Sequence, residues 1–305
     1  MHVDPTAALI FTCELQTNTE WRILFLRINR CSFPQPSIIA MADFGILIKQ
    51  RTFGQTARRD IWWLQPVLVF AGLSTFVVYA TWAALQGGHY FWGPYISPFY
   101  SPLLFGDSQH SLFGPKPSWL PDWGSPALLI LWIPGGFRLT CYYYRGAYYK
   151  AFWADPPSCS VGEPRASYRG ENAAPLIAHN LHRYFLYIAL PFLLFLVQDV
   201  WEALWFTNPG TGQASLGMGV GTIVLAANVI FLSGYALGCH SLRHLIGGGT
   251  DEMSKVPMCL KGYNCVSLLN LHHMRWAWLS LFWVMFSDLY VRLCSMGVWT
   301  DWRIL

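Results

Sequence analysis

The sequence predicts an all-α, polytopic membrane protein built as a bundle of five transmembrane helices. Hydrophobic residues make up 54% of the 305 positions and charged residues 12%, whereas soluble domains contain roughly 25% charged residues. The apolar residues are grouped into segments near the length of about 20 residues that a helix needs to cross hydrocarbon. These segments are 61–85, 125–144, 184–206, 216–242 and 276–298.

Charges are rare within these segments. The first and fourth contain none, and the second contains only Arg138. The third has Asp199 and Glu202 near its end, and the fifth has Asp288 and Arg292. The last two residues are spaced i,i+4, so they can pair across one helical turn. All five segments therefore suit a membrane interior.

The net charge is +4, but the placement of the charges is more informative than their sum. Lysines and arginines gather before the first segment and in the connections after the second and fourth. The connections 86–124 and 207–215 contain one positive residue, Lys116. By the positive-inside rule, we expect the N-terminus in the cytoplasm and the C-terminus outside.

Three regions follow from this topology. We expect a cytoplasmic segment over 1–60, the bundle over 61–298 with an aromatic and proline-rich external loop at 86–124, and a short external tail over 299–305. Met41 begins a stretch that reads like a natural protein start, so residues 1–40 are expected to be an upstream extension or a mobile tail. We place no function in them.

Histidines and cysteines gather at one end of four predicted spans. Two spans end at this belt and two begin there, and consecutive spans alternate direction, so all four ends face the cytoplasm. Ionisable side chains in spans are costly and usually functional. Their convergence at one depth suits a redox cofactor held in a helical bundle. The belt residues are Cys141, His179, His182, Cys239, His240, His244, His272 and His273.

Cationic residues accompany both belt cysteines. Cys141 lies three residues after Arg138 and four before Arg145, and Cys239 lies four before Arg243. Such neighbours share a helix face and favour the thiolate that binds metal. Three ligand sets remain open. Two histidines could bind a b-type haem, two cysteines with two histidines could bind a Rieske-type [2Fe–2S] cluster, and the same four could bind zinc.

Several segments are similar to a known family. They are GPYISPFYSP, PGGFRLTCYYYRGAYYKAFW, HNLHRYF, GCHSLRH and LHHMRW. The sequence from about residue 55 to 300 resembles the membrane-anchor subunit of succinate dehydrogenases and fumarate reductases, of the single-chain, five-helix kind. Members commonly bind two haems through histidines on the first four spans. Here the first span has no histidine and the second ends in Cys141, which resembles a branch that carries a membrane-embedded Rieske-type cluster instead.

That resemblance implies a set of site residues. Cys141 and Cys239 would bind one iron of a [2Fe–2S] cluster, and His182 and His240 the other. His179 and His244 are the alternatives to these two histidines.

A quinone site near the same interface is also implied. A quinone needs an apolar slot with one or two polar groups for its carbonyls. We expect Tyr144, Arg145, His273 and Trp276 to line it, with His273 or a tyrosine supplying protons.

The implied function is that of a membrane anchor of a succinate:quinone oxidoreductase, which links the tricarboxylic acid cycle to the respiratory chain. The anchor is not catalytic alone. It would lie in the cell inner (plasma) membrane, with an iron–sulfur subunit and a flavoprotein subunit docked on its cytoplasmic face, and would pass electrons to quinone or menaquinone. The alternatives are a b-type haem subunit of another respiratory complex and a polytopic transporter. A transporter is disfavoured because no internal repeat is apparent and Asp199, Glu202 and Asp288 lie toward the outer ends.

Overall fold

A computed structural model describes residues 52–106, 108–121, 124–165, 172, 174, 176–208 and 210–305. The expectations for residues 1–51, including the extension before Met41, lie outside the described residues. Residues 1–51 make up most of the predicted cytoplasmic segment 1–60.

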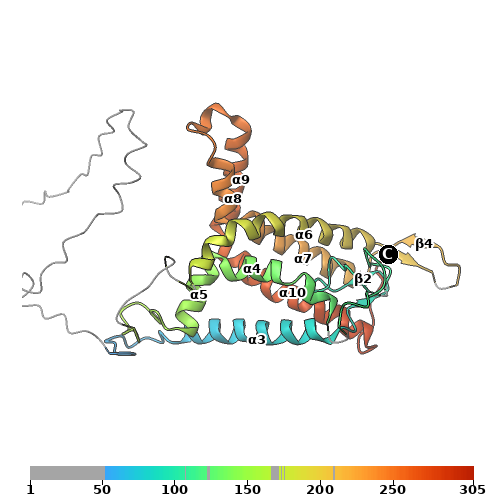
Figure 1. Cartoon of the computed structure of the whole chain (residues 1–305), viewed down its shortest axis with the longest axis horizontal. Helices are drawn as coiled ribbons and strands as arrows, with labels where there is room; N and C mark the ends of the chain where they lie inside the picture. Colours follow the sequence, from blue (N-terminus) through green and yellow to red (C-terminus); the bar gives the residue numbers. More distant parts are fainter. Residues whose placement is uncertain are drawn as a thin grey trace, which may run out of the picture. The chain divides into compact units, whose positions relative to one another are not determined.

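Four helices in the described part of the chain are long and apolar enough to cross a membrane. They correspond to the first, third, fourth and fifth predicted segments, and Figure 1 shows them running lengthwise beside one another. The third begins with a 3-10 turn at Leu176. The four are α3 (Leu64–Gln86), α6 (His182–Glu202), α7 (Val220–Leu237) and α10 (His273–Ser295).

The second predicted segment is interrupted. A 3-10 turn, η2 (Pro126–Leu129), and α4 (Trp132–Thr140) lead to Cys141, whose φ of −60° and ψ of 130° are those of an extended residue. The chain then continues as α5 (Tyr142–Phe152). Because ψ near +130° cannot continue an α-helix, the two helices take different neighbours: α4 packs on α6 and α5 packs on α3. A count of five spans therefore stays a prediction.

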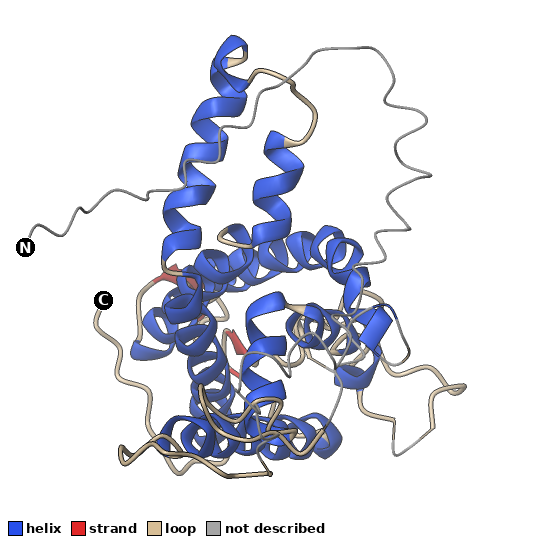
Figure 2. Ribbon diagram, turned by 90° about the vertical axis from the view of Figure 1, so that its left-hand side faces the viewer, coloured by secondary structure: helices blue, strands red, loops and turns tan. Residues whose placement is uncertain are grey.

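The fourth segment is interrupted in the same way. After α7, Cys239 has a φ of −66° and a ψ of 138°, and α8 (His240–Gly247) begins. A 3-10 turn, η5 (Met253–Lys255), joins α8 to α9 (Pro257–Leu271). Figures 1 and 2 show α8 and α9 side by side, extending away from the other helices. A third break at His272 precedes α10.

Two short hairpins close the opposite end of the bundle. β1 (Phe91–Trp92) pairs with β2 (Tyr95–Ile96), and β3 (Trp205–Thr207) pairs with β4 (Ala214–Leu216), both antiparallel. The loop that contains β1 and β2 packs into the bundle, because Tyr95 and Tyr100 are fully buried. The C-terminal residues also return to this end, where the Val220 N–H donates to the Trp302 carbonyl at 3.0 Å.

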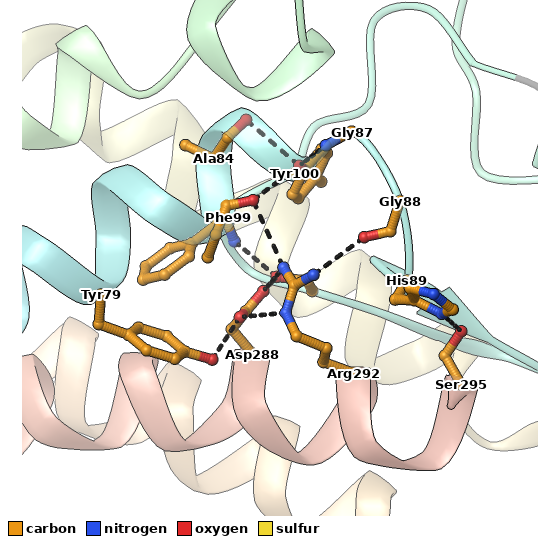
Figure 3. A network of polar contacts seen from close by, with 12 residues as sticks. Tyr79, Ala84, Gly87, Gly88, His89, Phe99, Tyr100, Asp288, Arg292 and Ser295 are labelled. Carbon is orange, nitrogen blue, oxygen red and sulfur yellow. Dashed lines mark hydrogen bonds and ion pairs between the residues drawn. The ribbon is translucent and has the colours of Figure 1, made fainter. Parts of the chain in front are cut away.

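A buried ion pair ties these parts together (Figure 3). Arg292 Nε donates to Asp288 Oδ2 at 3.2 Å, as the i,i+4 spacing predicts. Tyr79 Oη from α3 donates to the same oxygen at 2.7 Å, and Ser97 Oγ from the loop donates to Oδ1 at 2.5 Å. Arg292 Nη1 donates to the Gly88 carbonyl at 3.0 Å. One pair on α10 thus holds both α3 and the loop.

Replacing Asp288 with Ala should strongly destabilise the protein, because it leaves the Arg292 charge buried without its carboxylate partner. Breaking one side of a buried pair costs about 3–5 kcal/mol, and denaturant unfolding in detergent would measure the loss. Glu252→Ala is the control. Its partner Lys255 lies 2.8 Å away in an exposed pair, worth about 0–1 kcal/mol. Equal unfolding free energies for the two variants would contradict the assignment.

Candidate functional site

Helix breaks place both belt cysteines. Each lies between two helices and caps the start of the second one: the Arg145 N–H donates to the Cys141 carbonyl at 2.8 Å, and the Arg243 N–H to the Cys239 carbonyl at 3.2 Å. The cysteines are only 2% and 1% exposed. The start of a helix carries a partial positive charge, and each thiol lies beside one. Both thiols therefore occupy positions suited to metal ligation.

Each cysteine faces one histidine from a different helix. His182 Nε2, at the start of α6, lies 3.1 Å from Cys239 Sγ. His273 Nε2, at the start of α10, lies 3.6 Å from Cys141 Sγ. Throughout the described ranges, no three or more His, Cys, Asp and Glu side chains are grouped closely enough to hold a metal ion. The arrangement is therefore two thiol–imidazole pairs.

A threonine fixes the orientation of His182. Thr140 Oγ1 donates to the Gly136 carbonyl at 2.7 Å and lies 2.9 Å from His182 Nδ1. Because the single hydroxyl proton goes to Gly136, Thr140 accepts from Nδ1–H. The other ring nitrogen, Nε2, then keeps its lone pair directed at Cys239. Metal-binding histidines are oriented in this way by a partner on the second nitrogen.

An aromatic chain connects the two pairs. The Phe137 ring stacks on His182, with 4.7 Å between centroids and 5° between planes. Tyr235 stacks on His273 at 5.1 Å and 19°, and the Phe137 and Tyr235 rings meet edge to face at 5.4 Å. Such contacts orient rings as well as burying them. Both imidazoles are therefore held by neighbouring members of one buried cluster, which also contains Cys141 and Cys239.

The other belt histidines lie elsewhere. His240, a predicted ligand, is exposed on α8, and its Nε2 lies 2.9 Å from His244 Nε2. His179 Nε2 lies 2.9 Å from Tyr148 Oη. Burial raises the pKa of the Tyr148 phenol, which keeps it protonated. His272 is exposed at the break before α10. The structure thus brings His273, expected at the quinone site, to the cysteine instead of His240.

Tyr144, predicted to bind quinone, is already engaged within the protein. It is 3% exposed, and its hydroxyl donates to the Ala277 carbonyl at 2.5 Å and accepts from Arg138 Nη1 at 2.8 Å. Its hydroxyl proton is therefore used in joining α5 to α10.

Two other predicted quinone residues, Arg145 and Trp276, are only partly buried as whole side chains. Trp276 Nε1 is buried and has no hydrogen-bond partner in the part of the chain that the structure describes. The ring packs on Gly234, where an added Cβ would lie 2.6 Å away. The Arg145 guanidinium lies 4.4 Å from the Tyr142 ring centroid and is half-buried. Trp276 thus offers a donor that needs an acceptor.

Sequence reasoning did not single out Thr140 and Tyr235. Thr140 immediately precedes Cys141, and Tyr235 precedes Cys239 by four residues, which is one helical turn. Spacing could have placed Tyr235 near the site. The direction of its ring depends on α10, which periodicity does not show.

Comparison with known proteins identifies relatives. Residues 64–297 match the family described as actinobacterial succinate dehydrogenase subunit SdhC. A chain of the Mycobacterium smegmatis Sdh1 complex in the apo form has a similar structure, with 38% sequence identity and a TM-score of 0.76. The match covers 85% of this chain and 98% of that chain. No curated protein matches the sequence.

If the two thiol–imidazole pairs bind iron, replacing Thr140 with Val should weaken its retention. The change keeps the size of the side chain but removes the acceptor for His182 Nδ1–H, and loss of such a partner typically costs about 10–100-fold in metal affinity. Iron retained per complex during exposure to a chelator would measure the effect. Thr207→Val, the same change at an exposed position, is the control. Identical iron retention in both variants would show that Thr140 has no such role.

Proposed function

Because this chain belongs to the actinobacterial succinate dehydrogenase subunit SdhC family and is a membrane subunit of a succinate dehydrogenase complex, we propose that it carries electrons to a quinone through a metal group in its bundle. The electrons would come from an iron–sulfur subunit docked on the cytoplasmic face, which receives them from a flavoprotein subunit. The two buried thiol–imidazole pairs are the observation that carries this proposal.

The donor set fits a Rieske-type [2Fe–2S] cluster. Such a cluster takes two thiolates on one iron and two imidazoles on the other. Cys141 and Cys239 would supply the thiolates, and His182 and His273 the imidazoles. His273 replaces His240 in this proposal because His240 lies exposed on α8, whereas His273 contacts Cys141. When bound, the cluster would accept and donate one electron at a time.

Two other metal groups fit the geometry less well. A zinc site places four ligands around one ion, whereas the described ligands form two separate pairs. A b-type haem needs two histidines facing each other across the ring. His182 Nε2 and His273 Nε2 each face a thiol instead. A group that spans both pairs is therefore favoured.

The protein around the pairs has three tasks. Thr140 keeps the ligating nitrogen of His182 unprotonated, and the rings of Phe137 and Tyr235 hold the imidazoles in place. The apolar cluster around them excludes water, which strengthens local electrostatic interactions.

Trp276 Nε1 and Arg145 are the donors that we propose for a quinone carbonyl, since the Tyr144 hydroxyl already donates to the Ala277 carbonyl.

The proposed topology has five crossings in the cell inner (plasma) membrane, with the N-terminus in the cytoplasm. The crossing that would complete five consists of η2, which packs on α3, and α4, which packs on α6. The positive charge of the connections after α4 and α7 supports a cytoplasmic location for the two pairs. That location puts them beside the docked iron–sulfur subunit.

Metal analysis and spectroscopy of the purified complex test this function. We expect two irons and two acid-labile sulfides beyond those of the iron–sulfur subunit, and a paramagnetic resonance signal with a low average g-value. Cys141→Ala and Cys239→Ala should each abolish that signal and quinone reduction, while the complex still inserts into membranes. An unchanged signal in either variant, or a sharp reduced-haem band in the wild type, would overturn the proposal.

Two histidine variants separate the candidate ligands. His273→Ala should abolish the cluster signal, because it removes the imidazole that faces Cys141. His240→Ala should leave the signal in place, because its imidazole is exposed and contacts His244. The reverse result would restore His240 as the ligand and return His273 to the quinone site.

A further inference from the structure

Arg138 is a cation at the site with no anionic partner among the residues that the structure describes. It lies on α4, three residues before Cys141, and is half-buried. Nη1 donates to Tyr144 Oη at 2.8 Å, and Nη2 donates to Ser280 Oγ at 3.0 Å. Among the described residues, no carboxylate lies within ion-pair distance of its guanidinium. Arg292, in the same bundle, has Asp288 as its counter-ion.

The guanidinium also lies directly against the aromatic chain. Its Cζ is 4.8 Å from the centroid of Tyr235, and Tyr235 stacks on His273. Tyr235 and Cys141 belong to the same buried cluster. One aromatic ring therefore contacts both the cation and a proposed metal ligand. In a site of low polarity, a charge at this range acts more strongly than it would in water.

Even a half-buried cation without a counter-ion is costly unless a negative charge compensates it. Neutral hydroxyls and ring faces compensate only in part. In an oxidised [2Fe–2S] cluster, the charges of two ferric ions, two sulfides and two thiolates cancel, so the electron added on reduction leaves one unit of net negative charge. We propose that Arg138 is the charge-compensating residue of the site, which favours the reduced form of the metal group and so draws electrons from the docked subunit.

The inference rests on the function proposed above. In the step concerned, one electron passes from the iron–sulfur subunit to the metal group, whose charge becomes more negative by one unit. No covalent bond forms or breaks. The guanidinium keeps its proton throughout, as arginine does in proteins.

A structural clamp is the competing explanation, because the same contacts join α4 to α10. The two explanations differ in the property of Arg138 that matters. A clamp needs the planar fork with its several donors, which Lys cannot reproduce. Charge compensation needs only a positive charge at this place.

The reduction midpoint of the membrane group in the assembled complex, titrated by paramagnetic resonance, separates the two explanations. Arg138→Gln should lower the reduction equilibrium constant at least tenfold, which is about 59 mV for one electron. Arg138→Lys should keep most of the wild-type value. Arg183→Gln, which removes an exposed charge beside His182, is the matched control and should leave the midpoint unchanged because solvent screens that charge.

Ser280→Asp provides a second, independent variant. It would place a carboxylate next to Arg138 Nη2 and neutralise the cation without removing the side chain. The midpoint should fall as in Arg138→Gln, and this variant decides the matter if Arg138→Gln does not assemble. Retention of the metal group in Arg138→Lys, together with its loss in Arg138→Gln and Ser280→Asp, supports the same conclusion. Of these three variants, Arg138→Lys is the one that keeps an uncompensated positive charge at this place.

Three results would overturn the inference while leaving the proposed function standing. They are an unchanged midpoint in Arg138→Gln or Ser280→Asp, an equal fall in Arg138→Lys and Arg138→Gln, and loss of the group in all three variants. The last two would identify a clamp. Absence of the membrane signal from the wild-type complex would instead overturn the proposed function itself.

Discussion

A single extended residue between two helices is the constraint on which the site depends. Cys141 and Cys239 have nearly the same backbone angles, and each break ends one helix and starts another. The helices before the breaks, α4 and α7, stay in the bundle. Of the helices after the breaks, α5 turns toward α3 and α8 joins α9. Without the breaks, the thiols would lie along continuous helices, without the partial positive charge of a helix start beside them. The backbone conformation at the two breaks thus places each thiol at the start of a helix.

Long-range patterns in the sequence were sufficient for most of the bundle. Long apolar segments predicted four helices that the structure contains, and the i,i+4 spacing predicted the pair between Asp288 and Arg292. The positions of the breaks could not be predicted in this way, because neither Cys141 nor Cys239 is adjacent to a proline. Proline is the usual cause of a sharp change in a helix. Here tertiary contacts to different helices decide where each segment ends.

The meeting of cysteines and histidines from different helices was predictable, but the choice among the histidines was not. His240 and His273 both adjoin a helix break and look equivalent in the sequence. They differ because α8 leaves the bundle, which exposes His240, whereas α10 presents one face to the core through Ala277, Ser280 and Leu281. His273 precedes these residues by four, seven and eight positions, so it continues their face. The direction of the following helix therefore decides which imidazole meets a thiol.

The Arg292 side chain also determines how the first span ends. The last carbonyls of a helix have no partner within it, and lipid offers none. In α3, Arg292 Nη2 donates to the Ala83 carbonyl at 3.4 Å, and Tyr100 Oη donates to the same oxygen at 2.9 Å. These donors come from α10 and from the loop. The terminus of α3 is therefore solvated by protein side chains, so the length of this span need not match the thickness of the bilayer.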